Sequence, residues 1–154
     1  MEPLILVKKV SCTISRNGDL VHRIYLQTTL PQVDLTESGS VLKINGSSGD
    51  EITAGIARWC NWVGEKLINY AEIEIGGQRI DKHYGEWLHI WGQLTNSASH
   101  AEVYQRMVGN IPALTTNVAT NVAGTGGSIK AQNLYIPLQF WFCRNPGLAL
   151  PLIA

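Results

Sequence analysis

The chain has 154 residues, of which 45% are hydrophobic and only 16% are charged. That length accommodates one domain rather than two. Twelve basic side chains balance twelve acidic ones, which excludes a global field that draws the chain to DNA or to an anionic membrane. The charged fraction lies well below the roughly 25% of ordinary soluble domains. Such a composition is typical of a protein that buries much surface against neighbours, and a fragment of a larger domain has the same composition.

The chain ends and the cysteines indicate the cellular compartment of the protein and whether the chain is a fragment. No apolar run approaches the roughly 20 residues that a transmembrane helix requires. In the segment Met1 to Lys9 the charges follow the apolar stretch, the reverse of a secretory signal. Cys12, Cys60 and Cys143 cannot all pair with one another, which favours reduced thiols in an intracellular setting. The apolar run Leu148 to Ala154 has no polar tail, so we expect a piece of a longer polypeptide, cut at both ends.

The first third of the chain predicts strands. Val10 to Ile14 alternates apolar and polar residues, and the dipeptide Asn17-Gly18 that follows is a hairpin signal. A second strand is expected from Leu20 to Thr28, ended by Pro31. The polar stretch 32–50 predicts a loop, with a short strand at 40–44.

In the central third, the spacing of the apolar residues changes from helical to alternating and back to helical. The segment Ile52 to Ile68 has apolar residues at helical spacing, and Tyr70 to Ile75 then alternates as an amphipathic strand. Gly76-Gly77 predicts a tight turn into a returning polar strand. From Tyr84 to Leu94 the apolar residues recur every three or four positions, which predicts one helix stripe.

The last third contains a helix, a loop and a strand. Ser99 to Val108 predicts a short helix capped by Ser99, with Glu102 three residues later. Gly109 to Ser128 is rich in Thr, Asn and Gly and predicts an exposed loop in which proteases cut first. Leu134 to Phe142 alternates as a strand with large residues on both faces. Many short strands with Gly/Pro turns predict a mainly β sandwich or barrel, with short helices inserted in its loops.

Three blocks of the sequence closely resemble one protein family. They are Thr13 to Leu20 with the strand that continues to Leu30; Tyr70 to Trp87, which contains Ile75-Gly76-Gly77-Gln78-Arg79-Ile80-Asp81-Lys82-His83-Tyr84; and Leu134 to Ala154, which ends in Pro146-Gly147-Leu148-Ala149-Leu150-Pro151-Leu152-Ile153-Ala154. Together they resemble the major capsid proteins of large double-stranded DNA viruses of the phycodnavirus, iridovirus and mimivirus kind. The segments 32–64 and 109–131 match no pattern of that family.

The resemblance implies a fold and a function. It implies an antiparallel jelly-roll sandwich that is part of a double jelly roll, with residues 1–154 as a single partial domain and the second jelly roll absent. It further implies a virion protein, made in the host cytoplasm, whose homotrimers form pseudo-hexagonal capsomers of an icosahedral capsid. The partners would be neighbouring capsomers and minor capsid proteins, with no direct nucleic-acid binding and no transmembrane segment.

We expect neither catalysis nor a cofactor. Gly76-Gly77 lacks the third glycine of a dinucleotide fingerprint and the Gly-Lys-Ser/Thr of a P-loop. Glu72 and Glu74 share a strand face at a separation that glycosidases use, but catalytic carboxylates flank a cleft from different elements. The four histidines and three cysteines show no metal-ligand spacing. The protein is therefore predicted to be no enzyme and to hold no metal or nucleotide.

Other polar and aromatic residues leave alternatives open. The run Arg79, Asp81, Lys82 and His83 fits a solvated face, a salt-bridged seam between subunits or an active site, in that order. The tryptophans fit cores and subunit contacts, or the sugar-stacking platform of a jelly-roll carbohydrate-binding module. Asn45-Gly46-Ser47 fits a glycosylation acceptor weakly. With only five confident strands and an aromatic segment Phe140-Trp141-Phe142 expected at an edge, residues 1–154 alone should aggregate or oligomerise.

Overall fold

The computed structural model describes residues 9–34, 56–119 and 127–153. Its strands there are short: β1 Leu20–Val21, β2 Tyr25–Leu30, β3 Val33–Asp34, β4 Ile56–Ala57, β5 Tyr70–Ile75, β6 Gln78–Tyr84, β7 Val118–Ala119, β8 Ser128–Ile129, β9 Gln132–Pro137 and β10 Leu150–Pro151. Its helices are α1 Val63–Leu67, α2 Gly85–Thr95, α3 Ala98–Val108, α4 Pro112–Thr115, α5 Trp141–Arg144 and the 3₁₀ turn η1 Pro146–Leu148. The chain is therefore strand-rich with short helices between its strands.

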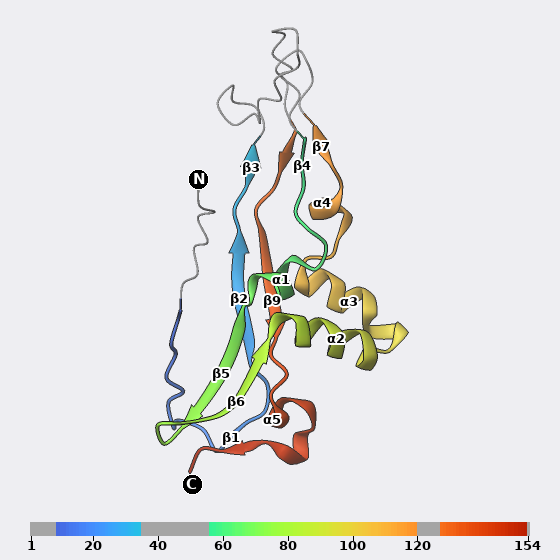
Figure 1. Ribbon diagram of the computed structural model, residues 1–154. Coiled ribbons are helices and arrows are strands. Elements are labelled where there is room, and N and C mark those ends of the chain that lie inside the picture. Colours follow the sequence, from blue (N-terminus) through green and yellow to red (C-terminus); the bar gives the residue numbers. More distant parts are fainter. Residues whose placement is uncertain (1–8, 35–55, 120–126, 154) are drawn as a thin grey trace, which may run out of the picture.

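The strands pair in a nested order. β1 pairs with β10, β2 with β9, β3 with β8, β4 with β7 and β5 with β6, and every pair is antiparallel. The described strands thus form a series of two-stranded ribbons that are nested in chain order. In Figure 1, β2 and β9 run side by side along the molecule, and β1 with β10 lies at its lower end.

One face of the β2–β9 ribbon forms the floor of the main core. Leu30 of β2 and both Leu134 and Ile136 of β9 are buried on this face, because side chains two apart on a strand point the same way. Helices α1 and α3 pack on β9, and α1 also contacts α2. The buried residues of this cluster are Leu30, Val63, Ile68, Leu88, Leu114, Ile129, Leu134 and Ile136.

Glycines allow the helices to approach closely. A Cβ atom on Gly64 of α1 would lie 2.8 Å from the Val108 carbonyl oxygen and 2.9 Å from Cγ1 of Ile136. On Gly85, the first residue of α2, a Cβ would lie 2.3 Å from the Ile68 carbonyl oxygen and 2.4 Å from that of Glu65. Only a residue without a side chain fits either position.

The hairpin from Tyr70 to Tyr84 and the helix after it fold as the sequence predicts. β5 covers the predicted strand, and β6 is the returning strand after the turn. Gly76 and Gly77 have φ of 60° and 80°, the two positive values that a two-residue hairpin of this kind requires. The predicted helix stripe is α2, in which Leu88 is buried while Leu94 is 76% exposed.

The prediction of an early hairpin was wrong. Residues 9–18 form no strand, and Val10 and Ile14 are exposed. Neither Asn17 nor Gly18 has positive φ, so no hairpin turn forms between them. The following strand, β1, pairs instead with β10 at the other end of the chain. A long-range pairing has overridden a local signal.

Two central predictions were wrong in part. In the predicted helix 52–68, residues 52–55 lie outside the described part, β4 is a strand, and only Val63–Leu67 is helical. The predicted loop 109–128 contains α4, β7 and the start of β8, and Leu114 is only 2% exposed. The backbone N–H of Trp59 donates to the Leu114 carbonyl oxygen at 2.9 Å, which ties this segment to β4. Residues 120–126, the predicted strand 40–44 and Asn45-Gly46-Ser47 lie outside the described residues.

The prediction of one continuous strand from Leu134 to Phe142 was also wrong. β9 ends at Pro137, and residues 141–144 form the helical turn α5. Phe140 and Phe142 are 3% and 0% exposed and pack with Ile73, so this segment is no exposed aromatic edge. At α3 the N-cap is Ser97 rather than Ser99, and Glu102 pairs with Arg106 instead of closing a capping box.

Candidate assembly surfaces

The outer face of the β5–β6 hairpin holds a cation between two aromatic rings. Tyr70 lies opposite Tyr84 and Glu72 opposite Lys82. The Lys82 ammonium lies 4.1 Å from the ring centre of Tyr70 and 5.1 Å from that of Tyr84, which is within cation–π range. Lys9 donates to Glu72 at 2.9 Å and so holds the segment before β1 against the hairpin.

The surface ion pair between Lys9 and Glu72 shifts the pKa of both side chains. The hydrogen bond to Glu72, and then its charge, hold the pKa of Lys9 above its usual range. The same bond holds the pKa of the Glu72 carboxyl below its usual range. Glu72 is thus engaged in an ion pair that tethers two segments, and it does not face Glu74 across a cleft.

The inner face of the same hairpin carries a buried histidine. His83 is 7% exposed, and its Nε2 lies 2.7 Å from Oδ2 of Asp81. Its ring meets Phe140 edge to face at 5.1 Å and Trp87 at 6.1 Å. The charged run therefore divides between faces: Asp81 and His83 pair with each other inside, Lys82 lies outside between tyrosines, and Arg79 is exposed.

A buried carboxylate on α1 forms contacts with both α2 and α3. Glu65 of α1 is only 1% exposed. Its Oε1 accepts a hydrogen bond from the Tyr104 hydroxyl of α3 at 2.6 Å, and its Oε2 lies 2.6 Å from Nδ1 of His89 on α2. The pKa of Tyr104 lies well above its usual range. Burial of the hydroxyl is the largest cause, and the hydrogen bond to Glu65 is the second. Both carboxylate oxygens have partners, as a buried charge requires.

We call Glu65 with its partners Tyr104 and His89 the Glu65 node. The residue before α1 adds backbone strain beside it. Trp62 has φ 59° and ψ 40°, a left-handed conformation that is rare for a bulky side chain. Its ring meets His89 at 5.3 Å and Tyr104 at 6.2 Å, and so covers the Glu65 contacts. Sequence reasoning placed this segment in a longer helix and missed Glu65, since a glutamate between helix-forming residues normally marks a solvated face.

The tryptophan side chains are partly buried and pack against neighbouring residues. All five lie in described segments, and none is among the exposed large hydrophobic residues. Trp87 stacks on Trp91 at 5.5 Å, and the Arg144 guanidinium lies 4.6 Å from the ring of Trp91. These contacts leave no exposed tryptophan platform of the kind that stacks on sugars.

Exposed apolar residues lie on several of the described elements, and α2 is one of them. On α2, Ile90 and Leu94 are 53% and 76% exposed. Further exposed apolar residues are Val10, Ile14, Leu20, Tyr25, Leu26, Ile56, Leu67, Ile75, Ile80, Tyr84, Val103, Tyr135, Leu148 and Ile153. Single exposed apolar residues are normal, but a helix that presents two of them one turn apart is a candidate contact surface.

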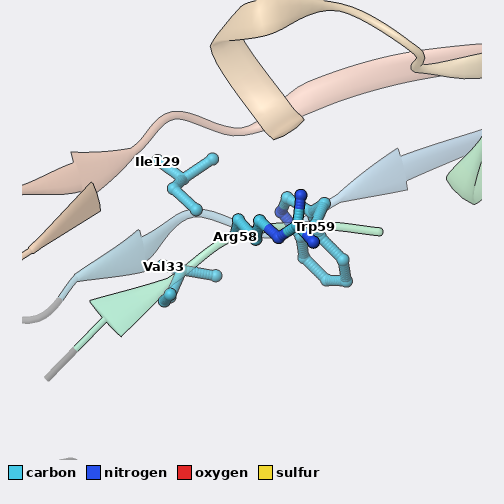
Figure 2. Close-up of a pocket in the computed structure, with 5 residues that line it drawn as sticks. Val33, Arg58, Trp59 and Ile129 are labelled. Atoms are coloured by element: carbon cyan, nitrogen blue, oxygen red, sulfur yellow. The ribbon is translucent and has the colours of Figure 1, made fainter. Parts of the chain in front are cut away.

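A small cavity opens beside β3 and β8. It has a volume of about 210 Å³ and is lined by Val33, Ala57, Arg58, Trp59 and Ile129. Figure 2 shows the labelled side chains converging on it from β3, from β8 and from the segment after β4. Its walls are largely apolar, and Arg58 is exposed.

No described residues form a group of three or more His, Cys, Asp or Glu that could hold a metal ion. Cys12, Cys60 and Cys143 are free thiols. Within the described segments, no helix is long and apolar enough to cross a membrane.

Comparison with known proteins gives one consistent result. Residues 5–154 match the family model described as "Major capsid protein N-terminus". The chain is 46% identical to the major capsid protein of Phaeocystis pouchetii virus and 48% identical to that of Pyramimonas orientalis virus, each over 96% of this chain. It spans only 29% and 31% of those relatives.

A solved structure agrees with the sequence relatives. The quasi-atomic model of the PBCV-1 virus capsid superposes with a TM-score of 0.60 at 31% identity, over 92% of this chain and 26% of that one. The family model covers nearly the whole chain, and the relatives exceed 40% identity. The chain belongs to the major capsid protein family and corresponds to the N-terminal part of its members.

Proposed function

We propose that the protein is a structural component of an icosahedral viral capsid and that it resides in the virion after synthesis in the host cytoplasm. The observation that carries this proposal is the likeness to major capsid proteins over 96% of the chain at 46–48% identity. The buried helical node and the low charge agree with a rigid building block rather than with a reaction centre.

The fold that we propose for the parent subunit is an antiparallel jelly-roll sandwich. Nested antiparallel pairing of β1 to β10 supports it, because rolling up one long two-stranded ribbon is how a jelly roll arranges its strands. We further propose that residues 1–154 are a single partial domain, the first of two jelly rolls. The chain's 29–31% share of its relatives' length is compatible with a second domain of similar architecture.

The assembly that we propose is a homotrimer in the full-length protein. Three copies, each with two jelly rolls, would form a pseudo-hexagonal capsomer that contacts neighbouring capsomers and minor capsid proteins. Closed symmetric rings are the usual solution for such subunits. In this role the protein performs no catalysis, takes no cofactor and does not bind nucleic acid directly. The half-buried tryptophans weigh against the alternative of a carbohydrate-binding module.

Quantitative mass spectrometry of purified virions tests this function. Peptides from the chain, such as the α2–α3 segment, should be among the most abundant in the particle and should exceed the genome copy number by orders of magnitude. A chain that is abundant in infected cells but absent from purified virions would refute the capsid role. A glycan array probed with the same protein should show no binding, whereas specific binding would favour the carbohydrate-binding alternative.

A further inference from the structure

The segment before β1 is fastened to the rest of the chain by one ion pair. We call residues 9–18 the strap; all of them are exposed, and none belongs to a strand or a helix. The Lys9 ammonium donates to Oε1 of Glu72 on β5 at 2.9 Å. Among the described residues, no other hydrogen bond or ion pair joins the strap to the rest of the chain. In Figure 1 the strap is the blue trace that descends beside β5.

A second cation lies opposite the same carboxylate. Lys82 of β6 is the cross-strand partner of Glu72, and opposite charges that face each other across two strands attract. The hydrogen bond from Lys9 is the largest cause that lowers the pKa of Glu72, and the charge of Lys82 also lowers it. Within the described segments, however, no ion pair joins Lys82 to Glu72. Lys82 therefore acts on the carboxylate through its charge but does not contact it.

Two tyrosines hold Lys82 away from that carboxylate. Tyr70 and Tyr84 face each other across the two strands, one pair along from Glu72 and Lys82 on the same face. The Lys82 ammonium lies 4.1 Å from the ring centre of Tyr70 and 5.1 Å from that of Tyr84. Both distances are within cation–π range. Because the ammonium is carried on a flexible four-carbon stem, it can bind either the rings or the carboxylate. With Lys82 on the rings, Glu72 is left to Lys9.

We propose that Tyr70 and Tyr84 control the strap by determining which lysine binds Glu72. While the rings hold Lys82, Glu72 binds Lys9 and the strap lies against β5. When Lys82 leaves the rings it binds Glu72, and the strap is released. An exposed ion pair and an exposed cation–π contact are weak and similar in strength, so a small change at the tyrosines shifts the balance between them. All five side chains belong to described residues of this one chain, so the exchange is independent of the capsid role.

Carbodiimide cross-linking of the full-length polypeptide that contains this chain tests the exchange, because the reagent joins a carboxylate and an amine that are in direct contact. In the unmodified protein, mass spectrometry should detect the Lys9–Glu72 cross-link about threefold more often than the Lys82–Glu72 cross-link, or more. The double variant Tyr70→Leu/Tyr84→Leu removes both rings and keeps apolar side chains in their place. It should lower the ratio of the first cross-link to the second by about fivefold or more.

Release of the strap has a second, independent readout. Arg16 lies within the strap and is exposed. In the tyrosine double variant, trypsin should cut after Arg16 several-fold faster than in the unmodified protein, because a released segment enters a protease more readily. Tyr25→Leu is the matched control, since Tyr25 is an exposed tyrosine on β2. It should change neither the cross-link ratio nor the rate of cleavage.

Removal of the competing cation should reverse the effect. Lys82→Met, added to the tyrosine double variant, should restore the Lys9–Glu72 cross-link to within about twofold of its unmodified level. Circular dichroism identifies a double variant that does not fold. In that case Tyr84→Leu alone decides, because the loss of one ring should still lower the cross-link ratio by about twofold.

Three outcomes would overturn the proposal. They are a cross-link ratio that the tyrosine variants leave unchanged, a Lys9–Glu72 cross-link that Lys82→Met does not restore, and cleavage after Arg16 that is no faster once the ratio has shifted. Abundance in virions is measured separately. A chain that is abundant in virions but whose cross-links ignore these variants therefore contradicts the exchange and leaves the capsid role intact.

Discussion

One carboxylate links three helices of this protein. Glu65 is almost wholly buried, and its two oxygens engage Tyr104 of α3 and His89 of α2 at 2.6 Å each. A buried charge with both oxygens bonded is tolerated, but the removal of a partner leaves it under-solvated. Trp62 covers the node from a strained left-handed conformation. At the residue scale, the helical layer therefore depends on a polar contact inside an otherwise apolar core.

Replacing Tyr104 with phenylalanine should destabilise the fold. Loss of the hydroxyl donor to a buried carboxylate should lower the free energy of unfolding by about 1–3 kcal/mol. Tyr135→Phe is the matched control, because Tyr135 is exposed on β9, and it should change stability by less than about 0.5 kcal/mol. Urea unfolding followed by circular dichroism measures both. Equal stability of the two variants would show that the Glu65 node carries no net stabilisation.

The same tyrosine predicts an alkaline transition. The native pKa of Tyr104 is raised above the ordinary 10.0, so its contribution to stability is complete below that pH. As the pH rises beyond it, the unfolded chain releases the phenolic proton while the native chain retains it, and stability falls. Unfolding measured between neutral pH and pH about 11 should show a steeper alkaline loss for the unmodified chain than for Tyr104→Phe. Identical alkaline slopes would contradict this assignment.

Among the elements, α2 shows how packing selects glycine. Its first residue, Gly85, lies against the backbone carbonyls of Ile68 and Glu65, where a Cβ would approach to 2.3–2.4 Å. Backbone atoms cannot move aside as a flexible side chain can. The contact fixes the end of α1 against the start of α2, and so positions both the Glu65 node and the outward face of α2.

Gly85→Ala should therefore be costly and Gly18→Ala should not. Overpacking typically costs about 1–3 kcal/mol, and the Gly85 variant should lie at or above the upper end because the clash is with backbone. A Cβ on Gly18 meets nothing within 4 Å and the residue has no positive φ, so that variant should shift stability by less than about 0.5 kcal/mol. Thermal unfolding of the pair decides: a Gly85→Ala chain as stable as Gly18→Ala would rule out the close approach.

Elements whose signals are local could be predicted from the sequence. The β5–β6 hairpin and α2 rest on alternation, on two adjacent glycines and on a 3.6-residue period, all within twenty-six residues. The early hairpin at Asn17-Gly18 failed because β1 finds its partner, β10, about 130 residues away. Phe140 and Phe142 alternate like strand residues, yet a helical turn buries both against Ile73. Glu65 has no sequence signature, because its burial depends on two helices that follow it.

At the scale of the whole molecule, the nested ribbon explains how distant segments meet. Each strand from β1 to β5 has its partner in the second half of the nest, so chain order alone sets which segments lie side by side. Non-local pairing of this kind folds slowly and leaves edges exposed until it is complete. The resemblance to a capsid family could be read from three sequence blocks, whereas the Glu65 contacts and the cavity beside β3 and β8 required coordinates. Their residues come from segments that are unremarkable in the sequence.

The most direct test of the capsid assignment is a cryo-EM reconstruction of the virion that carries this sequence. We expect residues 9–34, 56–119 and 127–153 to fit the density of the main shell at every repeated capsomer position, with the β2–β9 ribbon and the α1–α3 layer recognisable. Three copies should surround each local threefold axis. A main shell whose density is built by a different polypeptide, with this chain absent or confined to a few special positions, would contradict the capsid assignment.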